Sequence, residues 1–226
     1  MKRIFSISLI ILLFSTSYAF SAQAKKADKK GKTAFSLDSL IFKRLTNRLE
    51  VGYNNTARYG SGVSTTYFNG VKIGLTTELA MKNNFSLLTG VLYNLVYSDK
   101  RQGYPSATQV NYLAYGHFLN VPLMAVYNLP INRNLKMFAF AGPTLNYGLS
   151  QIRSTVSTVS TIPSAYTDLY KSSVLNQLDL QVGIGGGVQF KRYQLKGGYD
   201  YGLLNVNKSA GNLYQKGWYV SLSVNL

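Results

Sequence analysis

The sequence of 226 residues contains no cysteine, a single histidine, five prolines and only 14% charged residues. The absence of cysteine excludes disulfide bonds, thiolate metal ligands, a cysteine nucleophile and a lipid anchor attached through cysteine. One histidine without any cysteine also argues against a metal centre, so we expect no cofactor. The charged fraction is well below the roughly 25% of soluble domains, which points away from a soluble domain of ordinary composition.

Long apolar runs are also absent, because no stretch reaches the ~20 residues that a transmembrane helix needs. The apolar run at residues 4–14 follows Lys2 and Arg3 and precedes an Ala-Gln-Ala sequence at residues 22–24. A positive start, a short apolar core and an A-x-A site predict a signal peptide over residues 1–24. We therefore expect an exported protein whose membrane contacts come from strands.

The net charge of +16 could suggest a nucleic-acid partner. The basic residues are scattered or lie in a short run at residues 25–32, and no helix-turn-helix or RNA-binding motif accompanies them. We therefore expect no nucleic acid, and an anionic lipopolysaccharide surface fits the basic loops better. Residues 25–47 are predicted to form a basic periplasmic N-terminal segment, either a solvated leader or a contact to lipid phosphates or peptidoglycan partners.

The clearest pattern in the chain covers residues 178–204. Apolar residues alternate with polar residues or glycine up to residue 190, and the alternation resumes at residue 193. A period of two indicates a strand with unlike faces. Lys191 and Arg192 separate the two segments, which predicts an antiparallel hairpin with a minimal turn. Each strand has about a dozen residues, which is enough to cross a membrane as part of a barrel.

The same alternation predicts eight strands in a barrel domain over residues 48–226. The predicted strands cover residues 49–54, 71–79, 85–97, 119–127, 135–149, 178–190, 193–203 and 218–226. Tight turns are expected at residues 82–84, 130–134 and 191–192, and long loops at residues 56–66, 99–110, 150–177 and 205–212. Outer-membrane barrels have short periplasmic turns and long extracellular loops. We therefore predict an all-β fold, an eight-stranded antiparallel up-and-down transmembrane barrel with both termini in the periplasm.

Two features qualify this prediction. Pro122 removes a hydrogen-bond donor from its strand, so we expect a bulge or local irregularity there, and Gly142 with Pro143 predicts another. Alternation alone does not distinguish an apolar outer face from the apolar interior of a soluble lipocalin-type barrel. The strand lengths, the tyrosines near strand ends and the alternating loop lengths favour lipid on the outside.

Four segments carry a resemblance to a known family: residues 68–75 (FNGVKIGL), 83–93 (NNFSLLTGVLY), 118–123 (FLNVPL) and 139–143 (AFAGP). Together they resemble the PorT-like outer-membrane β-barrel family common in Bacteroidetes, a small barrel similar to OmpA and OmpX. The resemblance implies the barrel and says little about activity, although some relatives are tied to type IX secretion and gliding. The last strand resembles a recognition signal for the barrel-assembly machinery, with Leu226 where an aromatic residue is usual.

Several charged residues fall on the polar parity of the predicted strands and should point into the lumen. They are Glu50, Lys72, Glu78, Asp179, Lys196 and Asp200, and Lys136 is expected to join them. Eight strands enclose only enough space for side chains, and buried charges must be paired. We therefore predict a polar network that fills the lumen, in preference to a proton or solute path.

Catalytic chemistry finds little support in the sequence. A lipid-modifying enzyme would need a serine, a histidine and an acid together, and the lone His117 has only Asp99 as its nearest acid in sequence. No spacing motif supports such a triad, so we expect no enzyme and no catalytic, cofactor-binding or metal-binding residues. The glycines at residues 185–187 lie inside a predicted strand without a following helix, so they are expected to permit curvature and close packing rather than to bind phosphate.

The predicted extracellular loops are the remaining candidates for function. Tyrosines at the loop bases, Tyr170 among them, and the Ser/Thr-rich residues 150–177 form either a binding surface or a mobile solvated cover. We expect a barrel that acts in surface interaction, adhesion or envelope organisation. The alternative is a component of a secretion or transport assembly, and the third is an enzyme that modifies lipid A. Expected partners are outer-membrane lipid and lipopolysaccharide, the barrel-assembly machinery during insertion, and envelope proteins.

Overall fold

The computed structural model describes residues 44–60, 63–102, 110–157, 165–208 and 211–226. The predicted signal peptide and most of the predicted N-terminal segment lie outside the described residues, so both stay predictions. The first strand begins at Arg44, ahead of the domain boundary expected at residue 48. Within these described ranges, no helix has the length and apolar character needed to cross a membrane.

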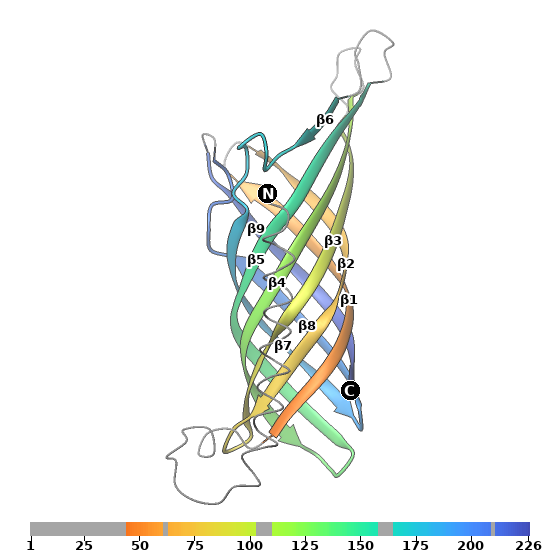
Figure 1. The fold of residues 1–226 in the computed structure, drawn as a ribbon, viewed down its shortest axis with the longest axis vertical. Helices are drawn as coiled ribbons and strands as arrows, with labels where there is room; N and C mark the ends of the chain where they lie inside the picture. The colour runs from red at the N-terminus through yellow and green to blue at the C-terminus, as the bar shows by residue number, and fades with distance from the viewer. Residues whose placement is uncertain (1–43, 61–62, 103–109, 158–164, 209–210) are drawn as a thin grey trace, which may run out of the picture. The chain divides into compact units, whose positions relative to one another are not determined.

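The described residues form nine strands: β1 (Arg44–Gly60), β2 (Val63–Ala80), β3 (Phe85–Gln102), β4 (Val110–Pro130), β5 (Leu135–Ser157), β6 (Ala165–Asp168), β7 (Leu178–Phe190), β8 (Tyr193–Gly202) and β9 (Leu213–Asn225). The hydrogen-bonded order is β4-β3-β2-β1-β9-β8-β7-β5, and the β4–β5 pair closes the ring (Figure 1). The short β6 pairs only with β5 and stands outside the ring. The predicted closed, eight-stranded antiparallel barrel is therefore confirmed.

The two faces of the barrel wall differ as the alternation predicted. On β9, Trp218, Val220 and Leu222 point outward and are 46–51% exposed, whereas Ser221 and Ser223, at alternate positions, are each 1% exposed. The apolar face is therefore outside, which excludes the lipocalin-type alternative. An apolar outer band of this kind is the surface that a lipid bilayer covers.

Aromatic side chains mark both ends of this outer band. Near the tight turns, the ring centroids of Phe85 and Tyr127 lie 5.0 Å apart. Farther from the turns, Tyr53 and Trp218 lie 5.6 Å apart. Tyrosine and tryptophan rings such as those of Tyr127, Tyr53 and Trp218 are favoured at a membrane–water boundary because one edge is apolar and the other polar.

The three tight turns lie where the sequence predicted them. Asn83 and Asn84 adopt positive φ angles of 58° and 65°, a conformation that asparagine tolerates well in two-residue hairpin turns. In the β4–β5 turn, the Asn132 Oδ1 atom accepts hydrogen bonds at 2.9 Å from the backbone N–H groups of Asn134 and Leu135. Lys191 opens the β7–β8 turn with a φ of 52°.

At the opposite end, the strands extend further than predicted into the first three connections, although the third still covers residues 158–177 between β5 and β7. Paired strand covers most of the predicted loop at residues 56–66, since β1 ends at Gly60 and β2 begins at Val63. β3, β4 and β5 likewise continue into the predicted loops, and β5 reaches 23 residues. Antiparallel strands keep their backbone hydrogen bonds above the membrane, where no apolar alternation is needed. Because about 9–11 residues cross a bilayer, these strands extend beyond it.

No bulge forms at Pro122. The β4–β5 register is the same at Pro122↔Thr144 and at Ala125↔Ala141, and its one shift lies at His117 and Phe118. The effect of Pro122 is a local interruption, since the β3–β4 pairs skip from Thr89↔Leu123 to Leu92↔Asn120 without changing register. The missing N–H donor interrupts the ladder, but the neighbouring pairs keep the strands aligned.

Candidate functional site: the lumen and its extracellular mouth

The lumen near the tight turns holds a buried ion-pair network. Arg48 is 1% exposed and lies 2.6 Å from the Glu78 carboxylate, and Lys136 lies 3.7 Å from the same group. The Asn128 side-chain amide also donates to Glu78 at 3.0 Å. Arg48 was not among the predicted lumen residues because the first strand was predicted to begin at residue 49. It could have been included, since it lies two residues before Glu50 and therefore points to the same face of the strand.

A second ion pair lies between β1 and β8. Lys196 Nζ is 2.8 Å from the Glu50 carboxylate, and both side chains are buried. Lys72 is also buried, and its Nζ lies 3.3 Å from the centroid of the Tyr219 ring, a cation–π contact. No described carboxylate lies within ion-pair distance of Lys72, and no described cation lies within that distance of Asp200.

Asp179 stands apart from these pairs. Its side chain accepts a hydrogen bond from the Gln181 amide at 2.8 Å. The structure therefore brings Glu50 and Lys196 together and gives Glu78 other partners. Lys72 and Asp200 are held in the lumen without an ion pair among the described residues.

The lumen also contains an apolar cluster that the sequence analysis did not predict. Its buried members are Leu88, Met124, Val126, Phe138, Phe140 and Tyr219. The sequence pattern did not show clearly which way these side chains point. Leu88 is an apolar residue on the otherwise polar face of its strand, and the faces of Phe138 and Phe140 were uncertain. These side chains fill volume that an eight-stranded barrel would otherwise leave to water.

The mid-strand glycines of β7 make room for this cluster. Gly187 lies opposite Phe138, and Gly185 lies opposite Phe140. A Cβ atom at Gly187 would approach the Phe138 ring to 2.6 Å, which is closer than real contacts allow. The close packing predicted for these glycines therefore has a specific cause in the two phenylalanine rings.

Polar and apolar side chains together leave an internal cavity of about 80 Å³. A cavity of this volume holds a few water molecules, and its charged lining offers them hydrogen-bond partners. Lys72, Lys196 and Asp200 line one part of it, and Phe138 and Phe140 line another. The arrangement suits a hydrated plug rather than a wide aqueous channel.

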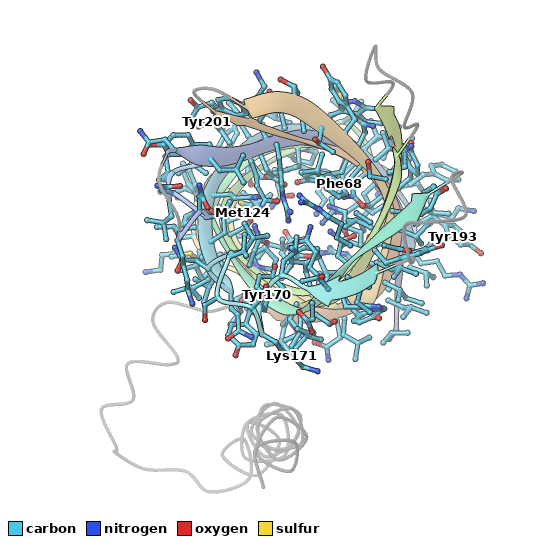
Figure 2. All side chains as sticks on the ribbon, turned by 90° about the horizontal axis from the view of Figure 1, so that it is seen from above. Phe68, Met124, Tyr170, Lys171, Tyr193 and Tyr201 are labelled. Atoms are coloured by element: carbon cyan, nitrogen blue, oxygen red, sulfur yellow. The ribbon has the colours of Figure 1, made fainter. Side chains whose placement is uncertain are left out.

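Tyr170, in the segment after β6, extends into the mouth of the lumen. Its ring packs against a buried cluster of Phe68, Val96 and Phe118, and its hydroxyl is hydrogen-bonded to Arg58. The Arg58 guanidinium lies 4.8 Å from the centroid of the Phe68 ring. Figure 2 shows Phe68 and Tyr170 within the ring of strands. Burial raises the pKa of the Tyr170 hydroxyl above its usual value, and Arg58 opposes that shift.

The segment that carries Tyr170 is held by the neighbouring connection between β8 and β9. The Asn176 N–H donates to the Val206 carbonyl at 2.8 Å, and the Lys208 N–H donates to the Val174 carbonyl at 3.0 Å. Leu175 and Val206 are 4% and 2% exposed. Much of the region that the sequence analysis treated as one long loop is therefore ordered structure at the mouth of the barrel.

His117 lies on the outer face, not at the mouth. Its Nδ1 atom is 2.5 Å from the Tyr93 hydroxyl. The Asp99 side chain lies outside the described residues, so the predicted absence of a catalytic triad stays a prediction. Within the described part of the chain, no cluster of three acidic or histidine side chains is placed to hold a metal ion.

A closed eight-stranded barrel with an apolar outer face and a filled polar lumen defines an outer-membrane β-barrel protein. A family model described as outer membrane protein beta-barrel domain matches residues 21–208, and the chain belongs to this family. Its location is the cell outer membrane. The match covers the broader family, and the PorT-like group remains a resemblance.

Solved outer-membrane barrels are similar to the chain over most of its length. Ail, the attachment invasion locus protein of Yersinia pestis, is 12% identical, with 81% of this chain and 100% of that chain covered and a TM-score of 0.39. Neisserial surface protein A is 11% identical with the same coverages and a TM-score of 0.43. The N-terminal barrel of Pseudomonas aeruginosa OprF is 11% identical, with coverages of 78% and 97% and a TM-score of 0.30. No curated protein matches the sequence.

Proposed function

We propose that this outer-membrane barrel binds a partner at the cell surface through its extracellular end, in adhesion or envelope organisation. The main support for the proposal is that β3, β4 and β5 continue as a paired sheet past the point where β2 stops pairing with β3. The β2–β3 pairs end at Asn69↔Tyr97, whereas the β3–β4 pairs continue to Gln102↔Val110. The β4–β5 pairs continue to Val110↔Ser157, and β6 extends this sheet beside β5.

The projecting sheet has an edge available to a partner. Residues 98–102 of β3 pair with β4 on one side and with no described strand on the other. An edge of this kind presents backbone N–H and C=O groups that can pair with an added strand. A surface protein with such an edge can bind an extended segment of another chain without a preformed pocket.

The charges at this end favour an anionic partner. Lys171 is 77% exposed at its side chain, and Arg153 and Lys208 are also exposed. The Asp168 carboxylate lies 3.9 Å from Lys171, and no described carboxylate lies within ion-pair distance of Lys208. Lipopolysaccharide and sulfated polysaccharides carry the complementary negative charge, which steers association at low ionic strength.

The test uses the full chain folded in detergent, with heparin and lipopolysaccharide as anionic probes and neutral dextran as the reference. Two variants test the positive charge and the sheet edge separately. The first, Lys171→Glu with Lys208→Glu, reverses the charge. The second replaces residues 99–113 by Asn-Gly, which shortens the β3–β4 hairpin above Ser98↔Ala114. We expect both variants to weaken binding. Undiminished binding by both variants would overturn the proposal. Retention of other envelope proteins that neither variant reduces, without any probe binding, would favour the secretion-assembly alternative.

A further inference from the structure

The three tight turns at the periplasmic end all carry positive charge. Lys82 lies in the β2–β3 turn and Arg133 in the β4–β5 turn, and the β7–β8 turn consists of Lys191 and Arg192. All four side chains are exposed. No ion pair joins them to a described carboxylate. Glu78 lies toward the same end but faces the lumen, where it is already paired. Among the described residues, the outer surface of this end therefore carries uncompensated positive charge.

Hydrogen bonds link the β7–β8 turn to the β4–β5 turn, and the β2–β3 turn to the last residues of β4. The Asn128 N–H, at the end of β4, donates to the Asn84 carbonyl at 2.9 Å, and the Lys191 N–H donates to the Asn134 carbonyl at 2.8 Å. We call Lys82, Arg133, Lys191 and Arg192 the basic rim. A partner that contacts one of these turns is therefore close to the next.

Aromatic contacts place part of the basic rim at the level of lipid headgroups. Lys191 Nζ lies 5.5 Å from the Phe190 ring centroid, and Arg192 Cζ lies 5.3 Å from the Tyr193 ring centroid. Arg192 also donates a hydrogen bond to the Tyr193 hydroxyl at 3.1 Å. Both rings are about half exposed on the outer face. Since such rings lie at the membrane–water boundary, the adjacent cations lie where the phosphates are.

We propose that the basic rim binds the phosphate groups of anionic phospholipids in the leaflet that faces the periplasm. Lysine and arginine at a bilayer surface attract anionic lipids, and the attraction fades within about 10 Å of the headgroups. The rim combines cations from three turns with rings that fix their height in the bilayer. The acidic surface of a periplasmic protein could also bind these cations. A protein partner would not explain why Lys191 and Arg192 lie next to aromatic rings that face the lipid.

The experiment incorporates the full chain into bilayers of phosphatidylethanolamine with a minor fraction of phosphatidylglycerol. Native mass spectrometry then counts the lipids that the protein retains after extraction. We expect phosphatidylglycerol to be enriched over its bulk fraction by roughly fivefold, the ratio expected from one favourable headgroup charge contact. The rim variant combines Lys82→Gln, Arg133→Gln, Lys191→Asn and Arg192→Gln. Asparagine is used at Lys191 because it tolerates the positive φ of 52°.

The matched control removes cations from the other end, with Lys171→Gln, Lys208→Gln and Lys216→Gln. We expect enrichment to disappear in the rim variant and to persist in the control. Fluorescence of Trp218, the one tryptophan in the sequence, checks that each variant is folded. Should the full rim variant fail to fold, Lys191→Asn with Arg192→Gln alone should still reduce enrichment. Retention of phosphatidylglycerol by the wild type at no more than its bulk fraction, unchanged enrichment in the rim variant, or rim-dependent retention of a protein in place of lipid would overturn the proposal.

Discussion

Phe140 of β5 lies opposite Gly185 of β7, and a Cβ atom at Gly185 would come within 2.4 Å of Phe140 Cζ. The same Cβ atom would lie 2.3 Å from the Gly197 carbonyl oxygen, so neither the ring nor the backbone leaves room for it. The glycine and the ring are therefore one packing unit across two strands. This relationship explains why a membrane strand has glycine on its lumen face, where a polar side chain would otherwise be expected.

Gly185→Ala should destabilise the barrel by about 1–3 kcal/mol, because overpacking forces side-chain and backbone shifts. Gly197→Ala is the matched control on the neighbouring strand, since its nearest atom would lie 3.5 Å away. The control should stay within about 0.5 kcal/mol of the wild type. Urea unfolding from lipid vesicles, followed by Trp218 fluorescence, measures both. Equal losses in the two variants would contradict the packing explanation.

Lys196→Met should cost about 3–5 kcal/mol, because it leaves the buried Glu50 carboxylate without its partner. Glu50→Gln combined with Lys196→Met removes both charges and should be more stable than Lys196→Met alone. The same unfolding measurement applied to the wild type, both single variants and the double variant isolates the coupling between the two residues. If the double variant lost the sum of the single effects, the pair would not be coupled.

Tyr170→Ala should release the segment 169–177 from the mouth of the barrel. The substitution removes both the hydrogen bond to Arg58 and the ring that packs against Phe68 and Phe118. We expect faster amide hydrogen exchange in that segment, by a factor that corresponds to about 2 kcal/mol, with the strands unaffected. Lys171→Ala is the control, because Lys171 is exposed. A uniform increase across the strands would show that Tyr170 supports the whole barrel rather than the mouth alone.

Docking of the same segment should weaken at alkaline pH. Burial raises the pKa of Tyr170 in the docked state, so docking has its full stability below the pKa of a free tyrosine, about 10. As pH rises through the raised pKa, the Tyr170 hydroxyl loses its proton more readily in the released segment than in the docked one. The docked state therefore becomes less stable relative to the released state. Cleavage of residues 169–177 by an alkali-stable protease should therefore accelerate with pH in the wild type more than in Tyr170→Phe. Equal pH dependence in the two proteins would assign the effect to other groups.

His117→Ala should leave the acylation pattern of lipid A unchanged. The His117 ring is engaged by the Tyr93 hydroxyl on the outer face. Ser150 lies opposite His117 in the β4–β5 ladder, but among the described residues its hydroxyl is hydrogen-bonded to Asp168 and not to the imidazole that would activate it. Mass spectrometry of lipid A from cells that express the wild type, His117→Ala or no barrel provides the measurement. A modification present with the wild type and lost in His117→Ala would establish the enzyme that we do not expect.

The part of the fold that follows from local chemistry could be predicted from the sequence. Alternation on β9 identifies Trp218 and Val220 as outward and Ser221 as inward, because a strand reverses its side chains at every residue. The turn at Asn83 and Asn84 follows from the tolerance of asparagine for positive φ. The extent of β1 beyond Thr56 could not be predicted in the same way, since backbone pairing continues in water after the apolar pattern ends.

The period of the strands, the tight turns and the set of charged residues on the lumen face all follow from residues that are neighbours in the chain. Which of these charged residues form pairs depends on how the strands are arranged in the closed barrel. Glu50 on β1 reaches Lys196 on β8 across the intervening β9, whereas Glu78 pairs with Arg48. The physical reason is that barrel closure and the stagger of all eight strands set the distances across the lumen, and no single segment contains that information.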